Sequence, residues 1–139
     1  MRAFWRKLRA DMLAIDTNIL VRALTGDHPE QAERVERLFS SNQIFIATTI
    51  LLETEWVLRR TFRYPKAKVL GALRALLYLP QVRIEDRERT ARALNLAEAG
   101  ADFADALHYV AADGCEQFVT FDKGLAKVAA GLPTQVAEP

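Results

Sequence analysis

Short apolar runs alternate along this chain with longer stretches in which apolar residues recur at helical spacing. Residues 12–15 are continuously apolar, which predicts a short buried strand. Residues 43–48 are rich in β-branched and aromatic side chains, which also favour a strand. Between them, residues 28–41 carry an apolar stripe of helical period. By the same reasoning we expect further strands at 81–86, 117–122 and 132–139, and helices at 17–26, 28–41, 50–62, 65–79, 86–100, 102–114 and 123–131.

Residues with known preferences for helix ends mark several of these boundaries. Asp16 and Thr17 are suitable N-cap residues for the helix after the first strand, and Gly26 is a suitable stop. Pro29 suits the first turn of the next helix. Pro65 ends a later helix, because the residue before a proline resists the α conformation. The cap chemistry therefore agrees with the boundaries that the periodicity predicts.

Strands that alternate with helices predict an α/β fold with a parallel sheet and helices on both faces. We expect three layers, α/β/α, with a central, mostly parallel sheet of four or five strands and about seven helices. The chain has 139 residues, which suits one domain, and no repeat, linker or low-complexity run divides it. We therefore expect a single domain at residues 12–139. Residues 1–11 are basic and amphipathic, and we expect an extension that is not native, or a helical arm.

Charge and cysteine content limit the possible classes of function. The 19 basic and 18 acidic residues leave a net charge of +1, so nucleic acid would have to be bound through local basic patches. The single cysteine, Cys115, excludes an internal disulfide and fits a reducing cytosol. No stretch is long and apolar enough to span a bilayer. We therefore expect a cytoplasmic protein without a membrane partner.

Four acidic residues lie where a metal-dependent phosphodiesterase would need them. Asp16 and Asp122 directly follow predicted strands, and ligands of open α/β sheets bind at the carboxyl ends of strands. Glu53 and Asp105 lie in apolar surroundings within predicted helices. Clustered carboxylates repel one another and usually persist only around a cation, which predicts Mg²⁺ or Mn²⁺ and phosphate chemistry. The alternative for Asp16 and Asp122 is simple capping of the helices that follow them.

The segments DTNIL, LLETEWVLRR, GADFADALHYVAA and VTFDKGL resemble, in this order, those of PIN-domain proteins. Specifically, they are similar to the VapC-type toxin ribonucleases of bacterial VapBC toxin–antitoxin pairs. The resemblance covers residues 12 to about 136. It implies a PIN-like fold and four catalytic acids, which are Asp16, Glu53, Asp105 and Asp122. It further implies that Asp16, Asp105 and Asp122 hold one or two Mg²⁺ or Mn²⁺ ions, while Glu53 binds or orients a water molecule.

Two neighbouring acids compete with these candidates. Glu55 lies two residues after Glu53, but the family places its glutamate three residues before the tryptophan, which is Trp56 here and selects Glu53. Asp102 is a fifth candidate, because residues three apart on a helix share a face and Asp102 would lie beside Asp105. The alternative for Asp102 is that it caps that helix.

Polar and aromatic residues complete the expected site. Proteins that this chain resembles use the residues at Asn18 and Thr120 to orient acids or water, although a helix-start asparagine and a strand threonine are ordinary as well. Trp56 and Tyr109 are expected to be core or groove residues rather than base-stacking platforms.

Basic residues concentrate around the ends of the helices that carry the expected acids. Arg22 and Arg59 are the best candidates to bind RNA phosphates, since each lies on the same helix as an expected acid or just after it. A solvated charged face is the alternative interpretation. It applies equally to the other members of this group, Arg60, Arg63, Lys66 and Lys68.

The resemblance also implies an activity and partners. The activity is metal-dependent hydrolysis of RNA phosphodiester bonds by an endoribonuclease, which leaves a 3′-hydroxyl and a 5′-phosphate on structured RNA, often tRNA or rRNA. The partners are a VapB-like antitoxin, bound in a hetero-oligomer, and a second copy in a homodimer. An alternative is a catalytically silent PIN-fold module that binds RNA or an antitoxin, but the intact set of acids argues against it. A haloacid-dehalogenase-like phosphatase would need an aspartate where the chain has Asn18.

Overall fold

The computed structural model describes residues 11–139. The extension expected at residues 1–11 lies, apart from Asp11, outside the described residues. The chain divides into two compact units, of which one ends at Arg87 and the other begins at Glu88. Each unit is described by itself.

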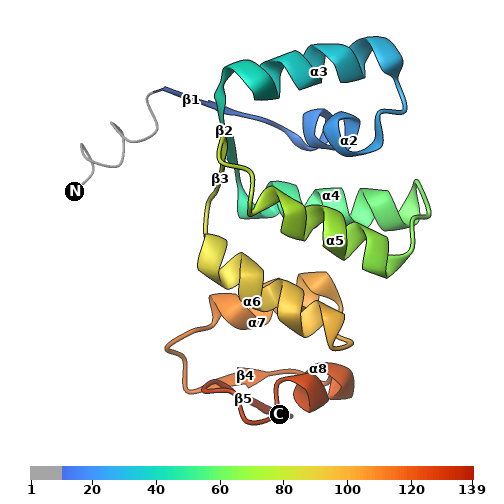
Figure 1. Ribbon diagram of the computed structural model, residues 1–139. Coiled ribbons are helices and arrows are strands. Elements are labelled where there is room, and N and C mark those ends of the chain that lie inside the picture. Colours follow the sequence, from blue (N-terminus) through green and yellow to red (C-terminus); the bar gives the residue numbers. More distant parts are fainter. Residues whose placement is uncertain (1–10) are drawn as a thin grey trace. The chain divides into compact units, whose positions relative to one another are not determined.

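The first unit is built on a sheet of three parallel strands (Figure 1). They are β1 (Met12–Ala14), β2 (Gln43–Ile46) and β3 (Val82–Ile84), in the order β1-β2-β3. Ala14 pairs with Phe45, and Ile46 pairs with Ile84. This register places the carboxyl ends of all three strands at one edge of the sheet.

Four helices accompany this sheet, and each begins or ends at a residue whose chemistry explains the boundary. They are α2 (Thr17–Thr25), α3 (Pro29–Ser41), α4 (Thr48–Arg60) and α5 (Lys66–Leu76). Gly26 ends α2 in the left-handed conformation, with φ 61°, which glycine adopts without a steric penalty. Helix α2 contacts α3 and α4, and α4 contacts α5. The core of the unit is aliphatic and includes Leu20, Ile44, Ile46, Leu51, Leu58 and Leu73.

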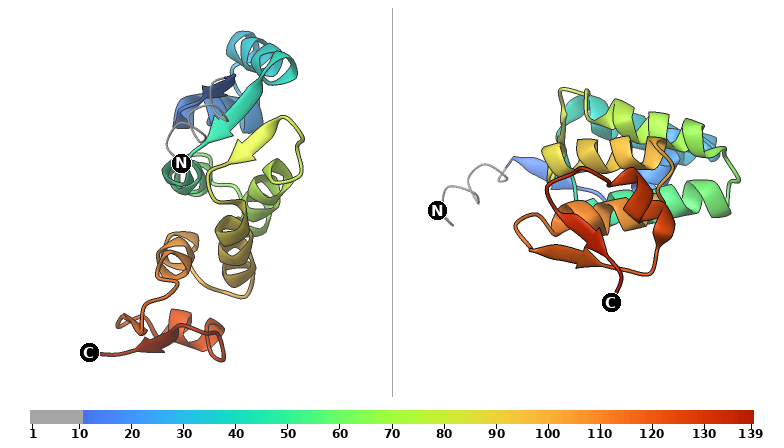
Figure 2. Two further views of the ribbon diagram at one scale, coloured as in Figure 1. Left: turned by 90° about the vertical axis from the view of Figure 1, so that its left-hand side faces the viewer. Right: turned by 90° about the horizontal axis from the view of Figure 1, so that it is seen from below.

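The second unit contains three helices and two strands. They are α6 (Arg87–Glu98), whose first residue closes the first unit, α7 (Phe103–Ala111), β4 (Gln117–Val119), α8 (Lys123–Val128) and β5 (Gln135–Ala137). Strands β4 and β5 form a parallel pair, which Figure 2 shows side by side. Tyr109 is buried, packs edge-on against Phe118 and donates a hydrogen bond of 2.6 Å from its hydroxyl to the carbonyl oxygen of Thr134. The core position expected for Tyr109 is thus confirmed.

The structure confirms the α/β class, the parallel pairing and, within residues 11–139, the seven helices. The strands differ from expectation in two respects. The five strands of residues 11–139 fall into two parallel sheets, of three strands and of two, rather than into one central sheet. Strand β1 is also less buried than predicted, with Leu13 41% exposed, because an edge strand has few neighbours to cover its side chains. In the part of the chain that the structure describes, no helix is both long and apolar enough to cross a membrane.

Asp113 connects α6 to the turn that follows α7. Its carboxylate accepts hydrogen bonds of 2.7 and 3.0 Å from the guanidinium of Arg92, and one of 3.2 Å from Nε of Arg89. The hydrogen bond from Arg92 is the main reason that the pKa of Asp113 lies below its ordinary value. Two arginines that bind one carboxylate form a small network, which is worth more than an isolated surface ion pair.

We expect Asp113→Asn to lower the free energy of unfolding by about 1 kcal/mol at neutral pH, because both arginines lose a partly exposed charged partner. A lowered folded-state pKa contributes stability above the unfolded pKa, and this stability is lost as the pH falls through the folded value. The difference between variant and wild type in urea unfolding should therefore be full at neutral pH and shrink below about pH 4. Glu33→Gln, which breaks an exposed ion pair on α3, is the control and should change little. An equal difference at all pH values would contradict this assignment.

Candidate functional site

Asp16 lies at the carboxyl end of β1 and caps α2. Its backbone is extended, with φ −92° and ψ 178°, and its Oδ1 accepts a hydrogen bond of 3.0 Å from the backbone N–H of Ile19. Capping occupies one carboxylate oxygen, while Oδ2 has no hydrogen bond to any residue from 11 to 139. The capping role and a ligand-binding role of Asp16 are therefore compatible.

Glu53 is joined to the start of α2 through Thr17. The hydroxyl of Thr17 donates a hydrogen bond of 2.9 Å to Oε2 of Glu53, which is exposed on α4. Asp16 and Glu53 are thus connected through adjacent residues, although 36 positions separate Thr17 from Glu53. Thr17 was not predicted as a site residue. In the sequence, only the position of Thr17 next to Asp16 indicated that it could belong to the site.

The structure separates Glu53 from its competitor Glu55. Glu55 is 2% exposed and forms an ion pair with Arg59 one turn later on α4. The prediction that the two glutamates point in different directions is confirmed. Glu53 itself lies on the solvent side of the helix, contrary to the argument from its apolar neighbours, because Leu51 takes the buried face instead.

Glu85 is a further acid at this edge of the sheet, and the sequence analysis missed it. It directly follows β3, and its Oε1 accepts a hydrogen bond of 3.1 Å from the backbone N–H of Thr48 in the first turn of α4. The N-cap residue of α4, Ala47, provides no side-chain bond, so the carboxylate of Glu85 takes that role. Glu85 could have been found by the criterion used for Asp16 and Asp122, because it is also an acid that directly follows a β-like run.

In the second unit, Asp102 caps the helix that carries Asp105. Its Oδ1 accepts hydrogen bonds from the backbone N–H of Ala104, at 2.9 Å, and of Asp105, at 3.3 Å. The capping alternative for Asp102 is therefore confirmed. Asp105 lies half-buried in the first turn of α7, where the acidic side chain also suits the helix dipole.

Asp122 is held from both sides of the turn between β4 and α8. Its Oδ1 accepts a hydrogen bond of 3.0 Å from the backbone N–H of Leu125, and its own N–H donates one of 3.0 Å to Oγ1 of Thr120. A Cβ atom on Gly124 would approach Oδ1 of Asp122 to 3.2 Å, so glycine suits the close turn. Thr120 thus positions the backbone of Asp122, as a supporting residue would.

Comparison of the sequence with protein families identifies the family of the chain. The model of the PIN domain matches residues 13–131. The chain belongs to the PIN domain family. The match begins in the first unit and ends in the second. No curated protein matches the sequence significantly.

PIN domains are generally nucleases, and they typically use divalent metal ions. In this PIN domain the predicted acids fall into two groups, Asp16 and Glu53 in the first unit and Asp105 and Asp122 in the second. Within residues 11–139, no group of three or more His, Cys, Asp or Glu side chains is gathered so as to hold a metal ion. Convergence of all four acids on one metal site stays a prediction.

The electrostatics of the second group suit a cation. Burial raises the pKa of Asp105, and the negative charge of Asp102 and a hydrogen bond with Asp122 raise it further. The backbone N–H of Leu125 lowers the pKa of Asp122, and its hydrogen bond with Asp105 acts in the same direction. A proton is therefore favoured on Asp105, which is hydrogen-bonded to Asp122. A divalent cation could take its place, and oxygen donors of this kind fit Mg²⁺ or Mn²⁺.

The two arginines predicted to bind RNA both have protein partners. Arg22 donates hydrogen bonds to Oε1 of Gln31, at 2.8 Å, and to Oδ1 of Asp27, at 3.1 Å. The guanidinium of Arg59 is bound by buried Glu55. Arg22 still lines an open cleft of about 490 Å³ between α2 and α3, and Asp16, Asn18 and Arg34 line it as well. Their role in RNA binding remains a prediction, and Arg22 is better placed for it than Arg59.

We expect Asp105→Asn to raise the thermal unfolding midpoint of the metal-free protein at neutral pH. Because the folded-state pKa of Asp105 is raised, the stability linked to its protonation is present below the unfolded pKa and is lost as the pH rises through the folded value. Asparagine keeps the uncharged state at every pH. Melting curves in the presence of a chelator should therefore separate variant and wild type at neutral pH and bring them together in acid. Glu116→Gln, at an exposed acid of the same unit, is the matched control. A destabilised variant at neutral pH would contradict the expectation.

Proposed function

We propose that this PIN domain is a metal-dependent endoribonuclease and the toxin component of a type II toxin–antitoxin pair. The observation that carries the proposal is the PIN domain match, together with candidate acids that the fold holds in fixed positions. Asp16, Asp102 and Asp122 each cap a helix through one oxygen, and Thr17 binds Glu53. Carboxylates that served only the fold would not explain the additional acids Glu53 and Asp105.

In the proposed reaction, Asp16, Asp105 and Asp122 would hold one or two Mg²⁺ or Mn²⁺ ions. A metal held there would supply a bound water molecule of lowered pKa and a positive charge beside the phosphate oxygens. Glu53 accepts a hydrogen bond from the attacking water and orients it, while Thr17 fixes the Glu53 carboxylate. Thr120 and the first turn of α8 hold Asp122 in place. Hydrolysis leaves a 3′-hydroxyl and a 5′-phosphate and does not involve the 2′-hydroxyl.

A free ribonuclease toxin would harm its host, so the proposal includes a VapB-like antitoxin. A helical antitoxin segment would bind in a groove between helices, and the cleft of about 490 Å³ between α2 and α3 is a suitable place because it contains Asp16. The proposed substrate is structured RNA, tRNA or rRNA. A homodimer, or a hetero-oligomer with the antitoxin, is part of the same proposal.

The proposal is tested by cleavage of a total tRNA and rRNA pool with purified protein and Mg²⁺ or Mn²⁺. We expect specific fragments from the wild type and a loss of at least about 100-fold in rate for Asp16→Asn, because metal binding and water activation contribute several kcal/mol. A chelator should abolish cleavage as well. Glu33→Gln, an exposed acid on α3 outside the proposed site, should cleave like the wild type. Cleavage that persisted in Asp16→Asn would reject the site, and its absence from a folded wild type loaded with metal would favour the silent binding module.

We expect Thr17→Val to reduce kcat about 10-fold with little change in KM, because Glu53 loses a hydrogen bond that orients it rather than a contact with RNA. Thr17→Ser keeps the hydroxyl and should recover most of the rate. Single-turnover cleavage of one identified RNA measures both variants. A rise in KM alone, or no recovery with serine, would show that Thr17 does not act through its hydroxyl.

A further inference from the structure

The solvent-facing side of α4 carries three side chains that the proposed reaction uses only in part. Glu53, Trp56 and Arg60 follow one another at spacings of three and four residues, which places them on one face of the helix. All three are exposed, and Trp56 is 54% exposed. Of the core and groove positions expected for Trp56, the core position is therefore wrong, because Leu51, Thr54, Glu55 and Leu58 form the buried face instead.

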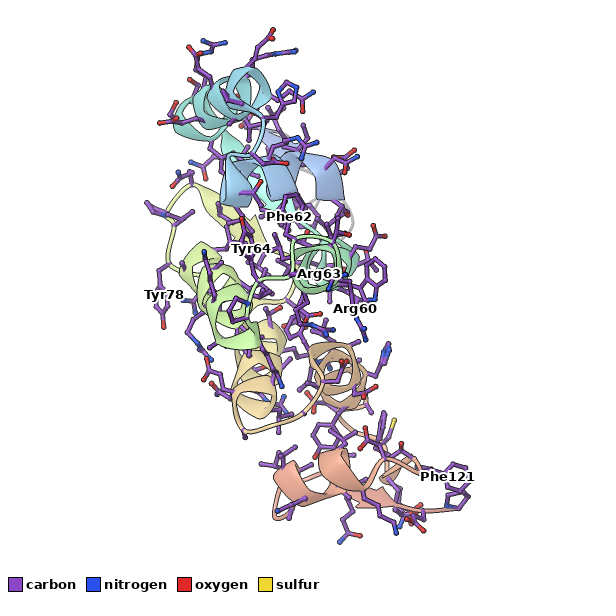
Figure 3. All side chains as sticks on the ribbon, turned by 90° about the vertical axis from the view of Figure 1, so that its right-hand side faces the viewer. Arg60, Phe62, Arg63, Tyr64, Tyr78 and Phe121 are labelled. Atoms are coloured by element: carbon purple, nitrogen blue, oxygen red, sulfur yellow. The ribbon has the colours of Figure 1, made fainter. Side chains whose placement is uncertain are left out.

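The turn after α4 carries aromatic and basic residues (Figure 3). The rings of Phe62 and Tyr64 are stacked, with centroids 5.9 Å apart and planes at 24°. Lys68 places its Nζ 4.4 Å from the centre of the Tyr64 ring. Between the two aromatics, Arg63 has a positive φ of 57°, which is uncommon for a residue with a side chain. The stacked rings thus hold a strained turn in which Arg63 is exposed.

Arg60 and Arg63 differ from Arg22 and Arg59 in having no partner in the part of the chain that the structure describes. Neither makes a hydrogen bond or an ion pair with any residue in the range 11–139, whereas Arg22 and Arg59 are bound to acids. Attraction to the carboxyl end of the α4 dipole accounts for Arg60, which lies in the last turn. It does not account for Arg63, which lies beyond the helix.

We propose that single-stranded RNA next to the cleaved bond binds along Trp56, Arg60 and Arg63, which we call the α4 tract. The inference rests on the proposed ribonuclease function. One base stacks on the indole of Trp56, and phosphates bind the unpaired guanidinium groups of Arg60 and Arg63. Glu53 precedes Trp56 by three residues, a rise of about 4.5 Å along the helix, so the stacked nucleotide adjoins the proposed water-orienting acid.

The chemistry of the tract favours RNA over a protein partner. The exposed neighbours of Trp56 on this face of α4 are Glu53 and Arg60, which are charged, so no apolar patch surrounds the indole ring. An aromatic platform flanked by unpaired cations is the combination that single-stranded nucleic acid binds, since every base has a flat face and every linkage a negative charge.

The fluorescence of Trp56 reports RNA binding directly, because the indole itself is the proposed stacking surface. The chain has two tryptophans, so Trp5→Phe leaves Trp56 as the only one, and Asp16→Asn prevents cleavage. Titration with a short unstructured RNA oligonucleotide in Mg²⁺ should quench the fluorescence of Trp56.

Affinities of variants test the same surface and are measured by the anisotropy of a labelled oligonucleotide. Trp56→Ala should weaken binding roughly 5- to 100-fold, while Trp56→Phe retains most of the affinity. Arg60→Gln and Arg63→Gln should each lower the slope of log K against log salt by about 0.7.

Matched controls come from the same unit. Tyr78→Ala removes an aromatic side chain that is 69% exposed and points away from the α4 tract (Figure 3), and Arg83→Gln removes an exposed charge on β3. Neither should change affinity. RNA binding without quenching, and with equal affinity in Trp56→Ala, would overturn the α4 tract even if the wild type cleaves RNA. A change in Trp56 fluorescence with protein concentration alone would assign the surface to self-association and overturn it as well.

These experiments distinguish a failure of the proposed ribonuclease function from a failure of the proposed RNA-binding surface. If the α4 tract variants weaken RNA binding but the wild type does not hydrolyse RNA with any metal, the nuclease function fails while the binding surface stands. If the wild type cleaves RNA and the tract variants keep its KM, the function stands and the surface does not.

Discussion

The constraint on which this molecule depends is how to keep several carboxylates in fixed positions. Three acids solve it in the same way, since Asp16, Asp102 and Asp122 each accept backbone N–H groups at the first turn of a helix. The partial positive charge of a helix start favours the ionised carboxylate, and the hydrogen bond fixes its direction. In each case the cap uses Oδ1, and because Oδ2 of Asp16 makes no hydrogen bond with any residue from 11 to 139, Asp16 can stabilise the fold and still present an oxygen to a ligand.

Helix α4 separates structural from functional charges on its two sides. On the buried side, Glu55 and Arg59 satisfy each other, because an unpaired charge with 2% exposure would be costly. On the exposed side, Glu53 is held by Thr17, and Trp56 and Arg60 face solvent. Glu85 holds the amino end of the helix at Thr48. The helix is therefore fixed at both its start and its inner face, which allows its outer face to remain free for binding.

Arginine content alone does not locate a nucleic-acid surface in a chain of net charge +1. What distinguishes the arginines here is whether an acid already binds them. Arg22, Arg59, Arg89 and Arg92 all contact carboxylates. Arg60 and Arg63 retain an unpaired charge among residues 11–139 and lie next in sequence to, or one helical turn from, aromatic side chains. An unpaired guanidinium can bind a phosphate without first breaking an ion pair.

The sequence by itself determined the features that depend on near neighbours. Helix periodicity, the N-cap at Asp16, the left-handed stop at Gly26 and the position of acids after strands all depend on residues within about one turn, and the structure has them where the pattern predicted. Only the tertiary structure decided what depends on distant residues. The hydrogen bond from Thr17 to Glu53, the contact of Glu85 with Thr48, the exposure of Trp56 and the division of the strands into two sheets belong to this class. Such contacts join positions tens of residues apart, and no local pattern of polar and apolar residues specifies which distant partner a side chain or strand will meet.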